Sequence, residues 1–140
     1  MSLSFLANLG SLVGLAATLW TAWSAYRSKR YYLLVGRVPD QIEDLQASTS
    51  ELVDINNDPE AERRDRLRAL KEVRIALESI ARNIGWRHKS EFLDLKARIT
   101  NIEQQEPLDP DTLDDVWAEA EALAGKAEEI VRDSKFARGS

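Results

Sequence analysis

Beyond residue 38, apolar side chains recur at intervals of three and four positions, which is the period of a helix with one buried face. Four segments carry such a stripe, at about 39–56, 60–84, 90–105 and from 110 onward. Short stretches rich in Pro, Gly, Asn and Asp separate them, and no stretch alternates in the manner of a strand. The pattern predicts an all-α protein in which residues 39–140 form an antiparallel bundle of about four helices.

The residues on or near the predicted buried faces of these four segments are Ile42, Leu45, Thr49, Leu52 and Ile55; Leu67, Leu70, Val73, Leu77, Ile80 and Ile84; Phe92, Leu95, Ile99 and Ile102; and Leu113, Val116, Trp117, Ala120, Leu123, Ala124, Ala127, Ile130 and Val131. Roughly a hundred residues patterned in this way are enough to bury a modest core.

Helix ends are predicted from residues with a clear capping chemistry. Gly85 is expected to end the second helix, and Ser90 to cap the third. Asp109 is expected to cap the last helix, with Pro110 as its first residue. Gly36 and the proline at position 39 predict a break between the N-terminal segment and the bundle.

The N-terminal segment differs from everything that follows, because no residue from Leu3 to Tyr26 is charged. A helix of this length is roughly 36 Å long, and a bilayer hydrocarbon core is about 30 Å thick. We therefore expect residues 1–34 to form a single-pass transmembrane helix with a basic and aromatic flank.

Two other interpretations of this segment stay open at this point. A cleavable signal peptide would place its positive charge before the apolar run, whereas here the charge follows it. A central helix of a soluble fold would need enough apolar surface elsewhere to surround it, and the stripes of the bundle suffice only for one another.

The flank of the segment predicts its orientation. Trp20 and Trp23 stand where an interfacial aromatic belt is expected, and Arg27, Lys29 and Arg30 follow them. Because basic residues beside a membrane helix stay in the cytoplasm, we expect the N-terminus outside and the bundle inside, at a bacterial inner membrane.

A helical projection divides this segment into two unlike sides. The apolar side holds Phe5, Leu6, Leu9, Leu12, Val13, Leu19, Trp20 and Trp23. The other side holds small and polar residues, among them Ser4, Asn8, Gly10, Ser11, Gly14, Ala17, Thr18 and Thr21. Membrane helices associate through such small residues, which predicts a homo-oligomer. Either the copies pair without a pore, or Ser4, Asn8, Ser11 and Thr18 line a narrow polar path.

Charge is distributed unevenly along the chain. Residues 39–58 carry six acids and no base, whereas residues 59–89 carry nine bases against five acids. The candidate contacts for an anionic ligand such as a nucleotide or oligonucleotide are Arg64, Arg68, Lys71, Arg82, Trp86 and Arg87. The same cations are equally explained by a solvent-exposed face that forms ion pairs with the acidic neighbouring helices. Trp86 is equally compatible with a core position at a helix turn.

Most catalytic and metal chemistry is excluded by composition. The chain has no cysteine, and His88 is its only histidine, so neither a thiolate metal site nor a histidine-based triad can be built. The six glycines do not cluster into a phosphate-binding loop. We expect no enzyme activity, no metal, no cofactor and no catalytic residue.

The run GSLVGLAATLWTAWSAY, followed by a basic stop and a short charged helical region, resembles the small single-pass membrane effectors of bacterial anti-phage defence, loosely the channel-forming effector of the Hailong system. The resemblance covers about the first thirty residues and the general layout. It implies a homo-oligomeric ion channel gated by a nucleotide or oligonucleotide on the cytoplasmic bundle, although the acidic last helix departs from expectation for a polyanion binder. The alternative function is a membrane-anchored helical adaptor that recruits a partner protein and conducts nothing.

Overall fold

The computed structural model describes the backbone of residues 2–139 and the side chains of residues 10–136. This part of the chain is helical and contains no strand, so the all-α prediction is confirmed. Its elements are α1 (Ser2–Tyr32), the π-helix η1 (Leu33–Arg37), α2 (Val38–Asn57), α3 (Arg63–Ile84), α4 (Lys89–Glu103) and α5 (Pro110–Gly139). The chain divides into two units, residues 1–32 and residues 33–140, which are described separately below.

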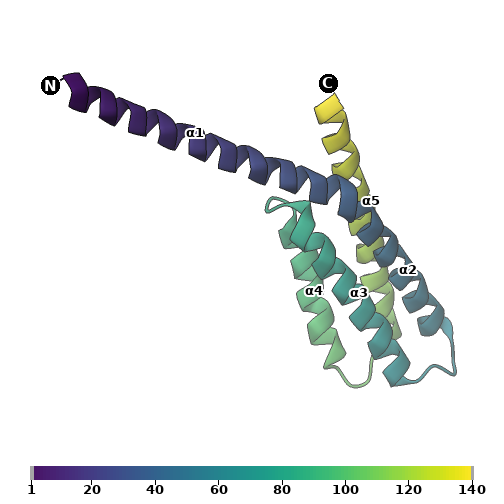
Figure 1. The fold of residues 1–140 in the computed structure, drawn as a ribbon. Helices are drawn as coiled ribbons and strands as arrows, with labels where there is room; N and C mark the ends of the chain where they lie inside the picture. The colour runs from purple at the N-terminus through teal and green to yellow at the C-terminus, as the bar shows by residue number, and fades with distance from the viewer. Residues whose placement is uncertain (1, 140) are drawn as a thin grey trace. The chain divides into compact units, whose positions relative to one another are not determined.

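The second unit is a four-helix bundle with antiparallel neighbours (Figure 1). Helix α2 packs between α3 and α5, and α4 lies against α3 and α5. The start of α2, the connection between α3 and α4, and the last turns of α5 therefore lie at one end of the bundle. The connections from α2 to α3 and from α4 to α5 lie at the other end (Figure 1).

The predicted apolar stripes form the core of this bundle. All of their residues are buried or half-buried except Trp117, which is 39% exposed at its edge. Val38 and Leu108 are buried in addition, although neither belongs to a predicted stripe. Every apolar residue that the structure describes as fully buried lies between positions 38 and 131, so this unit contains its own core.

The junction before the bundle corrects one prediction. Instead of a break at Gly36 and Pro39, the backbone stays helical and widens into η1 just before the proline. In a regular α-helix the ring of Pro39 would collide with the carbonyl of Val35, and the proline has no N–H to donate. A wider turn relieves this conflict without ending the helix.

Most of the predicted helix ends are found, with two differences. Asp109 caps α5 through a 3.0 Å hydrogen bond that its Oδ1 accepts from the backbone N–H of Asp111, and Gly85 ends α3 with a positive φ of 105°. Helix α4 begins at Lys89, so the prediction of Ser90 as its cap is wrong. Helix α3 begins at residue 63 rather than 60, with Glu62 as its N-cap, whose backbone N–H donates to the Asp65 carboxyl at 3.3 Å.

The first unit is the single helix α1, and none of the described helices is both long and apolar enough to cross a membrane. The transmembrane helix predicted from the sequence is thus not found among the described residues. The side chains of residues 2–9 lie outside the described part, and they include Ser4, Phe5, Leu6, Asn8 and Leu9 of the predicted span.

Candidate functional site

The described part of the small-residue side of α1 lies open on the helix surface. Gly10, Ser11, Gly14, Ala17, Thr18 and Thr21 are all exposed, whereas Ser4 and Asn8 lie outside the described side chains. The hydroxyl of Thr18 donates to the carbonyl of Gly14 at 2.9 Å, and the hydroxyl of Thr21 donates to the carbonyl of Ala17 at 2.9 Å. Both threonine donors are therefore satisfied within the helix itself.

Two glycines on this side pack against none of the described residues. A Cβ atom built at Gly10 or Gly14 meets nothing within 4 Å, and neither residue has a positive φ. Glycine in the middle of a helix costs about 0.5–1 kcal/mol relative to alanine. The space beside each glycine Cα is thus available to a neighbouring molecule, as in close helix–helix packing.

The opposite side of α1 exposes large apolar side chains. Leu12, Val13, Leu19 and Trp20 are between 62% and 67% exposed, and Trp23 is 50% exposed. Leu15, on the small-residue side, is 58% exposed. Exposed apolar side chains grouped in this way are typical of surfaces that contact a partner or a membrane.

The predicted interfacial residues at the end of α1 contact one another. The rings of Trp20 and Trp23 lie 5.5 Å apart, and the guanidinium of Arg27 lies 5.3 Å from the ring centroid of Trp23. Arg30 stacks on Tyr26 at 5.5 Å and donates to its hydroxyl at 2.9 Å. Lys29 is exposed beside them. The aromatic rings thus hold the guanidinium groups against the helix, which suits an interface between apolar and wet surroundings.

The predicted ligand contacts do not converge in the bundle. Arg64 and Arg82 lie roughly 27 Å apart along α3 at a rise of 1.5 Å per residue, so they cannot hold one nucleotide together. Two of these cations also form ion pairs with acidic side chains: Arg68 pairs with Asp65 at 3.7 Å, and Arg82 pairs with Glu78 at 2.8 Å.

The remaining contacts form two separate groups. Arg64 and Lys71 are exposed on the first half of α3 and make no ion pair with any described residue. Trp86 and Arg87 stand in the turn after α3, where Trp86 is 71% exposed and the Arg87 guanidinium lies 5.6 Å from its ring centroid. The alternative of a core position for Trp86 is therefore wrong. His88 is half-buried, and its side chain makes no capping hydrogen bond.

A carboxyl pair that the sequence did not predict joins α2 to α3. The pKa of Glu72 is raised above its ordinary value of 4.5, first by a hydrogen bond with the carboxyl of Glu51, then by burial and by the negative charge of Glu51. Arg68 opposes this effect. Glu72 also lines a hollow of about 220 Å³ between the two helices, beside the exposed Ile75. Sequence spacing cannot reveal this pair, because its members belong to different helices.

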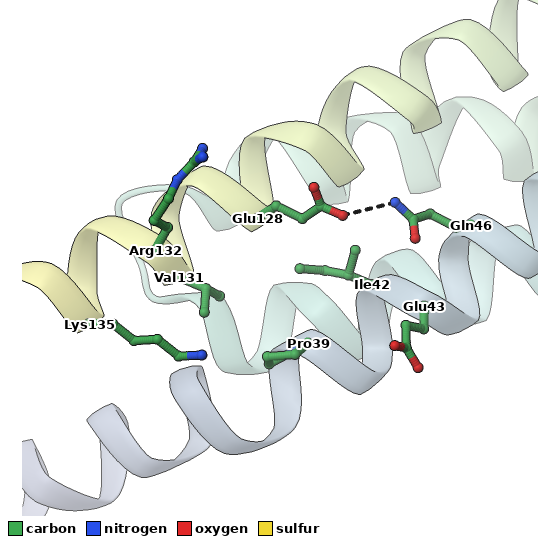
Figure 2. Close-up of a pocket in the computed structure, with 8 residues that line it drawn as sticks. All are labelled: Pro39, Ile42, Glu43, Gln46, Glu128, Val131, Arg132 and Lys135. Atoms are coloured by element: carbon green, nitrogen blue, oxygen red, sulfur yellow. Dashed lines mark hydrogen bonds between the residues drawn. The ribbon is translucent and has the colours of Figure 1, made fainter.

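A larger groove of about 400 Å³ lies between α2 and α5 and is shown in Figure 2. It is lined by Pro39, Ile42, Glu43, Gln46, Glu128, Val131, Arg132 and Lys135. Gln46 donates a 3.0 Å hydrogen bond to Glu128, and the Lys135 side chain extends toward Pro39 (Figure 2). With an apolar floor and charges of both signs at its rim, this groove suits an amphipathic group better than a polyanion.

The described residues contain no group of three or more His, Asp or Glu side chains that could hold a metal ion. No protein-family model, no curated protein and no solved structure matches this chain.

Proposed function

We propose that this protein is an oligomeric membrane protein of the bacterial inner membrane, in which residues 3–26 cross the bilayer and the bundle lies in the cytoplasm. The observation that carries the proposal is the apolar surface of α1 before Arg27, where no residue from Leu3 to Tyr26 is charged and the large side chains from Leu12 to Trp23 are at least half exposed. The proposed span includes residues 3–9, whose side chains lie outside the described part. The sequence there stays apolar and uncharged, with Leu3, Phe5, Leu6 and Leu9.

Self-association is the second part of the proposal. Lipid gives apolar helices no hydrophobic reason to associate, so contact depends on close backbone approach. Gly10 and Gly14 provide such an approach, since no described residue occupies the space beside them. Substituting both glycines with Ile should reduce crosslinked oligomers in bilayers, whereas Leu12→Ile with Leu19→Ile, on the opposite side, should not. Equal crosslinking of the two double variants would overturn this interface.

The activity that we propose is ion conduction by the assembled α1 helices, as an effector that depolarises the cell. Ser11 and Thr18 would face the assembly axis together with Ser4 and Asn8, because all four lie on the small-residue side. The role in anti-phage defence comes only from the resemblance of the N-terminal segment to such effectors.

Conduction is tested with the full chain in liposomes that enclose a potassium-sensitive dye. Wild type should release potassium, and Asn8→Leu with Ser11→Leu should abolish the release while crosslinking stays unchanged. Val13→Leu with Leu19→Ile is the matched control on the lipid side. A wild type that inserts and crosslinks but releases no potassium would overturn the pore.

A membrane-anchored adaptor is the second candidate, and one observation favours it. The hydroxyl protons of Thr18 and Thr21 are donated to the carbonyls of their own helix, so these side chains need neither water nor an ion to satisfy them. On this proposal the bundle recruits a partner protein and α1 only tethers it. Silent but oligomeric protein in the liposome experiment would support the adaptor.

Gating by a nucleotide or oligonucleotide would depend on the first half of α3. Arg64, Arg68 and Lys71 form a short exposed group there, with Asp65 as the one ion-pair partner recorded among the described residues. Charge reversal at Arg64 and Lys71 should remove oligonucleotide binding, and salt should weaken binding by the wild type. No binding by wild type at low salt would end this part of the proposal.

A further inference from the structure

The two ends of the bundle carry opposite charge. The end that holds the start of α2, the α3–α4 turn and the last turns of α5 is named the basic end (Figure 1). Among the described residues, its exposed cations are Arg37, Arg82, Arg87, Lys89, Arg132 and Lys135, and its exposed acids are Asp40, Glu43, Glu91 and Asp133. The opposite, acidic end exposes Asp58, Glu60, Glu62, Glu106, Asp109 and Asp111 beside the exposed Arg64 and the half-buried Arg63.

The α3–α4 turn at the basic end is held by backbone hydrogen bonds. The carbonyl of Gly85 accepts from the N–H of His88 at 3.3 Å and from the N–H of Lys89 at 3.1 Å. The positive φ of Gly85 redirects the chain at this point. Trp86 is therefore exposed by a defined turn.

Large aromatic side chains accompany the cations at this end. Trp86 is 71% exposed next to Arg87, and Phe136 is 80% exposed next to Lys135. Arg87 and Lys89 make no ion pair with any described residue, whereas Arg82 is answered by Glu78. Exposed apolar rings beside unpaired cations are poorly suited to bulk water and well suited to a lipid headgroup region, which is negatively charged outside and apolar beneath.

We propose that the basic end of the bundle docks on an anionic lipid surface, with Trp86 entering the headgroup region and Arg87 and Lys89 contacting lipid phosphates. The chain leaves the bundle toward α1 at residue 33, which belongs to this same end. This last argument rests on the proposed function, because it takes α1 to be the membrane segment. The charge and the exposed rings support docking independently of it.

A nucleic-acid strand fits this surface less well. Single strands are bound by cations that line a groove along the backbone, with several aromatic platforms. Here the cations of the turn stand on a tip, and the groove beside α5 has Glu43 and Glu128 in its lining. Oligonucleotide binding is kept as one outcome of the test below.

The experiment uses the full chain, which contains no cysteine, so single cysteines can be labelled selectively. A fluorophore is placed at Ser90→Cys beside the turn, or at Asp58→Cys at the acidic end as the matched control; both positions are exposed. The protein is reconstituted into vesicles of phosphatidylcholine, with or without phosphatidylglycerol, that contain lipids carrying a nitroxide on the headgroup. We expect quenching at position 90 only in the anionic vesicles, reversed by high salt, and none at position 58.

Charge variants identify the residues responsible. Arg87→Glu with Lys89→Glu should remove the quenching at position 90, and Trp86→Ser should reduce it. Arg64→Glu with Lys71→Glu makes the same change of net charge on the first half of α3 and should leave it intact. Equal quenching in neutral and anionic vesicles, or equal effects of the two double variants, would overturn the proposal. A third outcome would also overturn it. In that outcome an oligonucleotide binds wild type in solution but not the Arg87→Glu with Lys89→Glu variant, while the vesicle quenching of this variant equals that of wild type.

Extraction with alkaline carbonate separates this inference from the proposed function. In one outcome carbonate releases the protein, yet quenching at position 90 is still present and sensitive to salt. This result would contradict a membrane-spanning α1 and support the docking surface. Protein that resists carbonate but shows no quenching in anionic vesicles would support the spanning helix and sink the docking surface.

Discussion

The hydroxyl of Thr49 lies 2.7 Å from Oε1 of Glu121 and connects α2 to α5 across the core of the bundle. Thr49 is the one fully buried polar side chain among the described residues, at 0% exposure. Its oxygen also lies 2.9 Å from the carbonyl of Gln46, so its single proton has two acceptors. The half-buried carboxylate of Glu121 is charged, which makes it the stronger acceptor.

Replacing Thr49 with Val keeps the volume of the side chain and removes this hydrogen bond. We expect the free energy of unfolding to fall by about 1.5 kcal/mol, the lower limit for a bond to a charged group, because water can still reach part of Glu121. Urea unfolding followed by circular dichroism measures the change. Ser48→Ala removes an exposed hydroxyl that donates to the carbonyl of Asp44, and it should change stability by less than about 0.5 kcal/mol. Equal effects of the two substitutions would contradict the role assigned to Thr49.

Two glycines of the bundle should respond to alanine in opposite directions. Gly85 has a φ of 105°, which a residue with a Cβ adopts only under strain, so Gly85→Ala should cost about 1–3 kcal/mol. Gly125 lies inside α5 with ordinary helical φ, and a Cβ there meets nothing within 4 Å. Gly125→Ala should therefore stabilise the bundle by about 0.5–1 kcal/mol. Thermal unfolding of both variants measures these effects. A shift of the midpoint temperature in the same direction for both variants would refute this prediction.

Two ion pairs differ in solvent exposure and should differ in their contribution to the free energy of unfolding. The Nε of Arg74 donates to Glu103 at 2.9 Å between α3 and α4, and both side chains are about three-quarters buried. Arg98 pairs with Glu119 between α4 and α5, and both of those side chains are about half exposed. Arg74→Met should cost about 2 kcal/mol because it leaves the mostly buried carboxylate of Glu103 unpaired, whereas Arg98→Met should cost less than about 1 kcal/mol. Double-mutant cycles with Glu103→Gln and Glu119→Gln measure each coupling, and a larger coupling for the exposed pair would be the opposite of our expectation.

Local signals in the sequence account for most of the bundle. Periodicity alone identifies the buried faces, because a helix that must bury one side repeats its apolar residues every 3.6 positions. Asp109 and Gly85 mark helix ends for local reasons, namely a side-chain acceptor for Asp111 and a positive φ. The break predicted at Pro39 fails because the packing of Val38, which is fully buried, keeps the backbone helical around the proline.

The candidate sites depend on relations that local signals do not contain. Arg64 and Arg82 share a face of α3, but a common face does not bring side chains to one point, and roughly 27 Å of helix at a rise of 1.5 Å per residue separates them. The Glu51–Glu72 pair and the groove beside Lys135 each require the register between two helices. The charge difference between the ends of the bundle likewise follows only from the antiparallel order of its helices.

Two carboxylates of α3, those of Glu72 and Glu78, should contribute to stability with opposite pH dependence. Glu51 raises the pKa of Glu72, so the folded state holds this proton more tightly than the unfolded state does. The contribution of Glu72 to stability is therefore lost as the pH rises from the ordinary value of 4.5 through the raised pKa. Glu72→Gln should be more stable than wild type at neutral pH, and the difference should vanish below that range.

Glu78 provides the matched control with the opposite sign. Its pKa is lowered, first by the charge of Lys96 and then by its hydrogen bond with Arg82, so its stabilising contribution is present above 4.5 and is lost on acidification. Glu78→Gln should be less stable than wild type at neutral pH and should approach wild type in acid. Urea unfolding of the three proteins from neutral pH down to about pH 2, well below the ordinary value of 4.5, tests both signs. Because both residues lie on one helix and carry the same charge, a common response to pH would exclude the carboxyl pair between Glu51 and Glu72 as the cause.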